Sequence, residues 1–171
     1  MSTTVPTPAP TVTTIRPVRP HEFDAVGDLT QRAFAAGPYG HLPVSAERRM
    51  LERDTAARLR SGTVLVALDA DERVVGSATL LRPGTPEARL ARHDEAELRL
   101  LAVDPTLQRS GLGEQLVDAS LAEARRWGSR AVVLDTGALN VKAQRLYLRA
   151  GFARDTDRPV TAYPNIADLP H

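Results

Sequence analysis

The sequence predicts an α/β domain in which helices cover both faces of a mixed β-sheet. Three observations support this fold class. Short apolar strands alternate with amphipathic helices, and the order strand, helix, strand between residues 98 and 135 predicts a parallel βαβ crossover. Hydrophobic residues make up 42% of the 171 residues, enough for one domain around one buried core.

The N-terminal third is expected to supply one strand and two helices. Residues 1–13 are rich in Thr and Pro and carry no charge, which predicts a disordered tail. A strand follows over residues 14–19, and a first helix begins near Pro20 and ends before Gly37-Pro38. Ser45 is a good N-cap for a second helix over residues 46–60.

The central segment reads as a β-hairpin followed by a third strand. Apolar runs over residues 63–68 and 73–81 flank an acidic turn, which predicts antiparallel pairing. Gly76 inside the second run indicates a bulge or a close backbone approach. A long, arginine-rich loop over residues 82–95 leads into an apolar strand over residues 98–103.

The C-terminal part completes the crossover. An amphipathic helix runs from Leu112 to Gly128, and a fully apolar strand over residues 131–135 is expected to be covered on both faces. Asn140 should cap a last helix over residues 141–150. The remaining segment, residues 153–171, is expected to form two short strands on either side of residues 157–159.

The overall composition excludes several classes of function. There are 22 basic and 21 acidic residues, so the net charge of +1 provides no general attraction to nucleic acid or to a membrane surface. The absence of cysteine excludes disulfides, thiolate metal sites and a cysteine nucleophile in this chain. The N-terminus lacks the features of a secretory signal, and no apolar run could span a bilayer, so we expect a cytoplasmic protein.

The segment from Ala96 to Gly113 predicts an anion site. A strand stopped by Asp104-Pro105 is followed by a polar loop and by Gly111-Leu112-Gly113 at a helix N-terminus, where unpaired N–H groups and the helix dipole attract negative charge. A dinucleotide loop needs a third glycine where Leu116 stands, and a phosphate loop of the Walker type needs a lysine that is absent. A turn that binds nothing is the remaining alternative.

Two motifs resemble those of the GCN5-related N-acetyltransferase (GNAT) family. Residues 108–113, QRSGLG, are similar to the family signature Q/R-x-x-G-x-G/A. Residues 140–152, NVKAQRLYLRAGF, resemble its second marker, an Asn-initiated helix with a Tyr four residues before Gly-Phe. The resemblance implies a GNAT domain over residues 14–171, with a mostly antiparallel sheet around the crossover, and acetyl-CoA as co-substrate without a metal.

The resemblance also implies which residues hold the coenzyme. Backbone N–H groups of the glycine loop would bind the pyrophosphate; these belong to Gln108, Arg109, Ser110, Gly111, Leu112, Gly113 and Glu114. The strand before this loop splays from the next one in the family, so that backbone groups of Leu101 and Val103 would pair with the pantetheine arm. The N–H of Ala102 or Val103 would bind the oxyanion, and Asn140 is a helix cap that can also touch the coenzyme.

Acetyl transfer needs a base for the ammonium group of the acceptor and an acid for the leaving thiolate. The resemblance implies that Tyr147 is the acid; its alternative is a packing role in the core. Glu97 is the expected base, on a strand face that alternation assigns also to Arg99, Leu101 and Val103. The alternative for Glu97 is a solvated or Arg-paired residue, and Glu95 is a weaker substitute.

The remaining histidines, arginines and loop residues offer few additional sites. The histidines are widely spaced, so no metal site is expected. Arg82, Arg89 and Arg92 either form an anion-binding rim or belong to a solvated loop. By analogy with the family, Tyr39 and His41 lie where the acceptor groove forms.

Together these observations predict an N-acetyltransferase that moves acetyl from acetyl-CoA to a primary amine by direct attack in a ternary complex. The acceptor is expected to be a small molecule or a peptide, and a homodimer is left open. Two alternatives remain: a coenzyme-binding module without chemistry, and an acyltransferase that uses another acyl donor or a hydroxyl acceptor.

Overall fold

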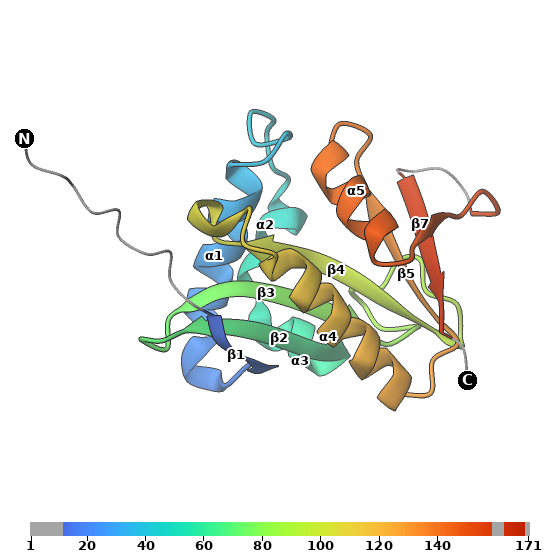
Figure 1. Ribbon diagram of the computed structural model, residues 1–171, viewed down its shortest axis with the longest axis horizontal. Helices are drawn as coiled ribbons and strands as arrows, with labels where there is room; N and C mark the ends of the chain where they lie inside the picture. The colour runs from blue at the N-terminus through green and yellow to red at the C-terminus, as the bar shows by residue number, and fades with distance from the viewer. Residues whose placement is uncertain (1–11, 159–162, 170–171) are drawn as a thin grey trace, which may run out of the picture.

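A single sheet with the strand order β1-β2-β3-β4-β5-β7-β6 forms the centre of the computed structural model, which describes residues 12–158 and 163–169 (Figure 1). Neighbouring strands are antiparallel except β4 and β5, which run parallel. The predicted sheet, mostly antiparallel around one βαβ crossover, is therefore confirmed. The strands are β1 Val12–Pro17, β2 Gly62–Asp69, β3 Val74–Leu81, β4 Glu95–Val103, β5 Ala131–Thr136, β6 Ala153–Arg154 and β7 Tyr163–Asp168.

Helices cover both faces of this sheet, as predicted. The helix α4 crosses over between β4 and β5 and lies on one face together with α5, and α1, α2 and α3 lie on the other (Figure 1). Their bounds are α1 Phe23–Ala35, α2 Ala46–Arg53, α3 Thr55–Ser61, α4 Leu112–Arg126 and α5 Val141–Arg149, with short 3-10 helices η1 Pro20–Glu22 and η2 Pro105–Leu107.

Two apolar clusters hold the layers together. The larger joins the inner face of α4 to β3, β4 and β5 and includes Leu116, Val117 and Tyr147. The smaller packs α1 against β2 through Val26 and Val66. Both faces of β2 and β3 are thereby buried, which explains why these strands read as continuous apolar runs.

Three sequence predictions about the boundaries are corrected. The single helix expected over residues 46–60 is two helices, because Asp54 ends α2 and its side chain caps α3 by accepting a hydrogen bond from the Ala57 N–H at 2.9 Å. Strand β1 begins at Val12, two residues before the predicted start. Strand β4 begins at Glu95, three residues earlier than predicted. The tail prediction otherwise falls on residues 1–11, outside the described part.

Local signals set several other boundaries as predicted. Ser45 caps α2 by accepting from the Arg48 N–H, and Asn140 caps α5 by accepting from the Ala143 N–H. Gly128 ends α4 with a φ of +74°, a left-handed conformation that favours glycine. No described helix is both long and apolar enough to cross a membrane.

Candidate functional site

Strands β4 and β5 form a fork. They pair in parallel at three positions, which are Glu95 with Ala131, Ala96 with Val132, and Glu97 with Val133. Beyond this point β4 continues to Val103, and no further pairing with β5 is found in the described residues (Figure 1). The splay implied by the family resemblance is therefore present, and the edge of β4 that faces the gap offers extended backbone to a ligand.

A bulge lies in the part of β4 that borders this fork. Leu100 has a φ of +54°, which is rare for a leucine. The ladder with β3 pairs Thr79 with Arg99 and Ser77 with Ala102, so three steps along β4 match two along β3. One extra residue is thus inserted into β4, and it re-aims the side chains that follow it.

Because of the bulge, the alternation of side chains between the two faces of the sheet shifts by one residue between the first and second halves of β4. Leu101 and Val103 pack against the α4-side core, to which Ala96 and Leu98 also belong. The prediction that Glu97 shares a face with Leu101 and Val103 is therefore wrong. The extra residue places them on the opposite face from Glu97.

The other face of β4 carries polar side chains toward α2 and α3. Arg99 pairs across the ladder with Thr79, whose hydroxyl accepts a hydrogen bond from Arg58 of α3 at 2.9 Å. Arg58 is completely buried, and burial lowers its pKa to about 10. The polar face of β4 is thus tied to the helices that cover it.

Glu97 is buried, with 1% of its surface exposed, and it holds the loop that precedes β4. Its two carboxylate oxygens accept the backbone N–H groups of Arg89 at 2.7 Å and Leu90 at 2.6 Å. Burial raises the pKa of the Glu97 carboxyl. Within the described part of the chain, the side chain is therefore neither solvated nor paired with arginine, which were the two alternatives to a catalytic role.

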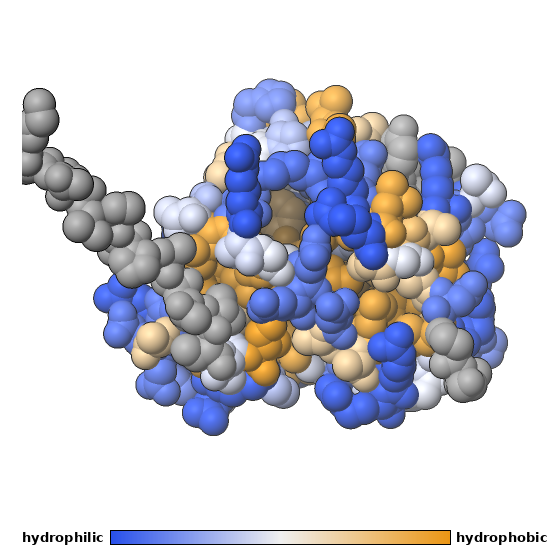
Figure 2. Space-filling view, in the orientation of Figure 1, coloured by the Kyte–Doolittle hydropathy of each residue, from blue (hydrophilic) through white to orange (hydrophobic). Residues whose placement is uncertain are grey.

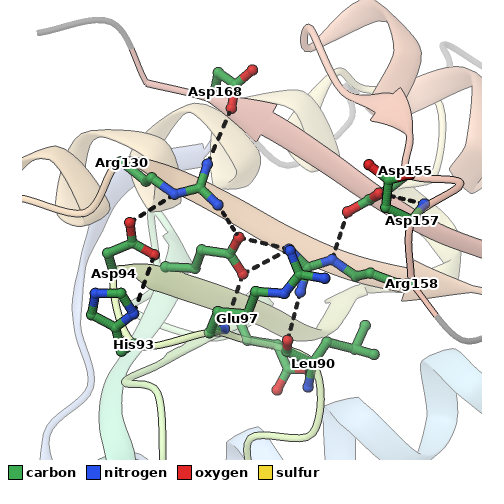
Figure 3. A network of polar contacts seen from close by, with 11 residues as sticks. Leu90, His93, Asp94, Glu97, Arg130, Asp155, Asp157, Arg158 and Asp168 are labelled. Atoms are coloured by element: carbon green, nitrogen blue, oxygen red, sulfur yellow. Dashed lines mark hydrogen bonds and ion pairs between the residues drawn. The ribbon is translucent and has the colours of Figure 1, made fainter.

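Glu95, the weaker substitute for the base, lies at the root of the fork in an ionic network with Arg130 and Arg158. Figure 3 labels these two arginines and their other partners. Glu95 is fully buried and accepts hydrogen bonds from Arg158 at 2.6 and 2.8 Å and from Arg130 at 2.8 Å. Arg158 also pairs with Asp155 and donates to the carbonyl of Leu90 at 2.7 Å. One carboxylate thus joins the start of β4, the start of β5 and the C-terminal segment.

The glycine loop forms a cradle of backbone N–H groups. Asp104 starts η2 by accepting from the Thr106 N–H at 3.0 Å, and Gly111 then takes a φ of +81° before α4 begins. In the described residues, the first backbone N–H of α4 with a carbonyl partner is that of Gln115, which donates to Gly111 at 3.2 Å. The Ser110 N–H donates to the Leu107 carbonyl at 3.1 Å, and the Leu112 N–H donates to the Ser110 hydroxyl at 3.4 Å. The N–H groups of Gly113 and Glu114 have no partner in the described residues and are therefore available to an anion.

Polar and apolar contacts hold this loop against α5. Lys142 donates to the side chain of Gln108 at 3.4 Å, and Arg149 pairs with Glu114 at 2.8 Å. A Cβ at Gly113 would lie 3.3 Å from the Leu146 side chain, so this glycine allows α4 and α5 to approach closely. The two sequence motifs are thereby brought together.

Tyr147 lies on the inner face of α5. Its ring belongs to the main core and contacts the Phe152 ring with a centroid distance of 5.6 Å. Its hydroxyl has no hydrogen-bond partner in the described residues. The oxygen is not fully enclosed by protein, so it is open to a ligand or to water. Burial and the charge of Asp135 raise the pKa of the phenol, which keeps it protonated as a donor.

A bridge crosses the far end of the fork. The Leu139 N–H after β5 donates to the Tyr39 hydroxyl in the α1–α2 loop at 2.9 Å, and the Tyr39 ring packs against Gly137. Figure 2 shows a hollow with an apolar floor in this region, between α5 and the elements on the other side of the fork. His41 is exposed in the same loop.

The structure separates the three arginines that were considered as a rim. Arg89 reaches Asp135 of β5 with a distance of 3.4 Å and so spans the fork. Arg82 stacks on Trp127 at 4.0 Å from the ring centroid, and Arg92 is exposed. The sequence reasoning missed Asp135 as a site residue, although its position at the end of an apolar strand was a usable signal.

Comparisons with known proteins agree on one family. The model described as "Acetyltransferase (GNAT) family" matches residues 24–152. A mycothiol acetyltransferase from Cellulomonas flavigena is 36% identical over 133 residues, which cover 77% of this chain. The chain spans only 37% of the length of that relative.

Solved structures share the fold. A GNAT-family acetyltransferase from Staphylococcus aureus superposes with a TM-score of 0.76 at 16% identity, covering 92% of this chain and 99% of that one. The PaiA N-acetyltransferase of Thermoplasma acidophilum, solved in complex with coenzyme A, gives a TM-score of 0.74 at 15% identity, with 91% and 98% covered.

Proposed function

Because this chain belongs to the acetyltransferase (GNAT) family, we propose that it transfers an acetyl group from acetyl-CoA to a primary amine. The amine attacks the thioester directly in a ternary complex. The observation that carries this proposal is the junction of the strand fork with the N–H cradle, because it offers extended backbone and an anion site on one continuous path. Such a path complements a pantetheine arm that ends in a diphosphate.

In this proposal backbone groups hold the coenzyme. The unpaired N–H groups between Gln108 and Glu114 bind the pyrophosphate, and the backbone of Leu101 and Val103 pairs with the pantetheine amides. The bulge at Leu100 supports this assignment, because it turns the edge of β4 near the end of the fork. An N–H of Ala102 or Val103 then stabilises the oxyanion of the tetrahedral intermediate.

Tyr147 is the proposed acid. Its free hydroxyl and its raised pKa support donation of a proton to the leaving thiolate. Glu97 is the proposed base, and it acts through a water molecule because each of its oxygens already accepts a backbone N–H. A raised pKa suits a base that must release its proton again near neutral pH. Asn140, whose side chain caps α5, is proposed to touch the coenzyme as well.

The test combines binding with turnover. Thermal unfolding is measured with acetyl-CoA and with free CoA, and thiol release is then followed across a panel of amines that includes the acceptor of the mycothiol acetyltransferases. The proposal expects stabilisation by both ligands and thiol release with at least one amine. Absence of stabilisation by either ligand contradicts the coenzyme site. Stabilisation without thiol release favours a coenzyme-binding module without chemistry, and release only with another acyl donor or an alcohol favours the other acyltransferase.

A further inference from the structure

Arg99 is a half-buried guanidinium without a carboxylate partner in the described residues. Its one hydrogen bond there is from Nη1 to the backbone carbonyl of Glu87, at 2.7 Å. By contrast Arg158, a buried arginine at the root of the fork, pairs with the carboxylates of both Glu95 and Asp155. A guanidinium offers five N–H donors, so most of those of Arg99 are not used by the protein.

The unused donors of Arg99 face accessible space. The fully enclosed polar side-chain atoms without partners, among the described residues, are the Nε of Arg58 and the hydroxyl of Ser77. No nitrogen of Arg99 is among them, so its free N–H groups are open to a ligand. Taking a charged group partly out of water without a counter-ion is costly, and the cost is offset when an anion binds.

Two further arginines act electrostatically on Arg99. Arg89 spans the fork to Asp135 at 3.4 Å, and Arg48 of α2 holds Glu52 through its Nε at 2.9 Å while stacking over the Phe34 ring. Burial, followed by the charge of Arg89, lowers the pKa of Arg99, with Arg48 adding to the effect. The positive charges of Arg89 and Arg48 thus act on Arg99, which favours an anionic ligand there.

We propose that Arg99 binds a carboxylate of the acceptor, so that the preferred substrates are amines that carry a carboxylate close to the amino group. This inference rests on the proposed function, because it concerns the acceptor of that reaction. The planar guanidinium suits a bidentate contact with a carboxylate. Asp135, which has the opposite charge, lies at the same fork and complements the ammonium end of a zwitterionic acceptor.

The test compares matched acceptors that differ in one group. Each α-amino acid is assayed beside its primary amide and its aminophosphonate analogue, by thiol release at saturating acetyl-CoA. Because a hydrogen bond to a charged group contributes about 1.5–3 kcal/mol, the acid should exceed the amide by about 10- to 100-fold in kcat/KM, mainly through KM. A preference for the phosphonate over the acid would contradict the carboxylate assignment.

Variants then assign the preference to one residue. Arg99→Gln should abolish the difference between acid and amide, and Arg99→Lys should retain part of it. Arg125→Gln is the matched control, since Arg125 is exposed on α4, on the other face of the sheet. The comparison of acid with amide in the unmodified protein stays decisive even where a variant does not fold.

The outcomes separate this inference from the proposed function. Equal turnover of acid and amide, or equal effects of Arg99→Gln and Arg125→Gln, would refute the carboxylate site while the acetyltransferase assignment stands. If no amine releases thiol, the proposed reaction fails. Calorimetric titration of the CoA-saturated protein with the amino acid and with its amide then decides whether Arg99 forms a carboxylate site. Binding of the acid that depends on Arg99 supports the site, and equal or absent binding overturns it.

Discussion

Replacement of Tyr147 by Phe removes one oxygen atom and leaves the packing of α5 intact. The ring keeps its place in the core and its contact with Phe152, whose centroid lies 5.6 Å away. The hydroxyl has no described hydrogen-bond partner, so the variant loses no known internal hydrogen bond. We therefore expect the free energy of unfolding to change by less than about 0.5 kcal/mol. Loss of a general acid should in contrast lower kcat by about 100-fold or more.

The assay measures thiol release at saturating acetyl-CoA, together with urea unfolding and the Kd of coenzyme A. The expected pattern is a large fall in kcat at nearly constant coenzyme affinity and stability. Because burial raises the pKa of the phenol, the unmodified enzyme should show no loss of activity from Tyr147 ionisation up to about pH 10, its ordinary pKa. A parallel loss of affinity and stability would make Tyr147 a packing residue, and an unchanged kcat would refute its role as the acid.

Three further predictions concern the loop, the strand and the network. Gly111→Val should weaken coenzyme A binding by about tenfold or more, because a β-branched residue is strained at φ +81° and displaces the N–H cradle. The control is Gly128→Val, at φ +74° far from the loop, which should lose stability but keep its affinity for coenzyme A. If both variants bind coenzyme A equally well, the cradle does not hold the coenzyme. The pKa of Glu97 is raised, so the folded protein keeps the Glu97 proton above pH 4.5, the ordinary pKa of this group. In urea titrations, the free energy of unfolding of the unmodified protein relative to Glu97→Gln should therefore fall as the pH rises above 4.5. A difference in unfolding free energy that does not change with pH would contradict this. Arg158→Met should lower the free energy of unfolding by about 3 kcal/mol, because it removes a partner from the buried Glu95. A double variant that also changes Glu95 to Leu should lose less stability than Arg158→Met alone. A double variant that is less stable than Arg158→Met would contradict the pairing.

Local rules accounted for most of the fold. Cap residues such as Ser45 and Asn140 mark helix starts by satisfying backbone N–H groups a few residues away, so their effect is readable in a short window. The crossover was readable from the order of apolar and amphipathic segments. The break at Asp54 was missed because an aspartate within a polar helix resembles a solvated residue until its capping contact with Ala57 is seen.

The candidate site was less predictable, because its polar contacts join distant segments. The bulge at Leu100 places a leucine at positive φ, which no local pattern indicates, and it overturned the face assigned to Leu101 and Val103. Arg158 reaches Glu95 across 63 positions of sequence, and Tyr39 reaches Leu139 across 100. Such pairs follow from the topology of the sheet rather than from spacing along the chain.

The bridge between Tyr39 and Leu139 has a consequence for how acceptor preference can diverge among relatives. It links two loops that lie outside the sheet ladder, whereas the proposed coenzyme path is lined largely by main-chain groups of β4 and of the turn before α4. On the proposed function, substitutions in the bridging loops should therefore change acceptor preference more than donor use.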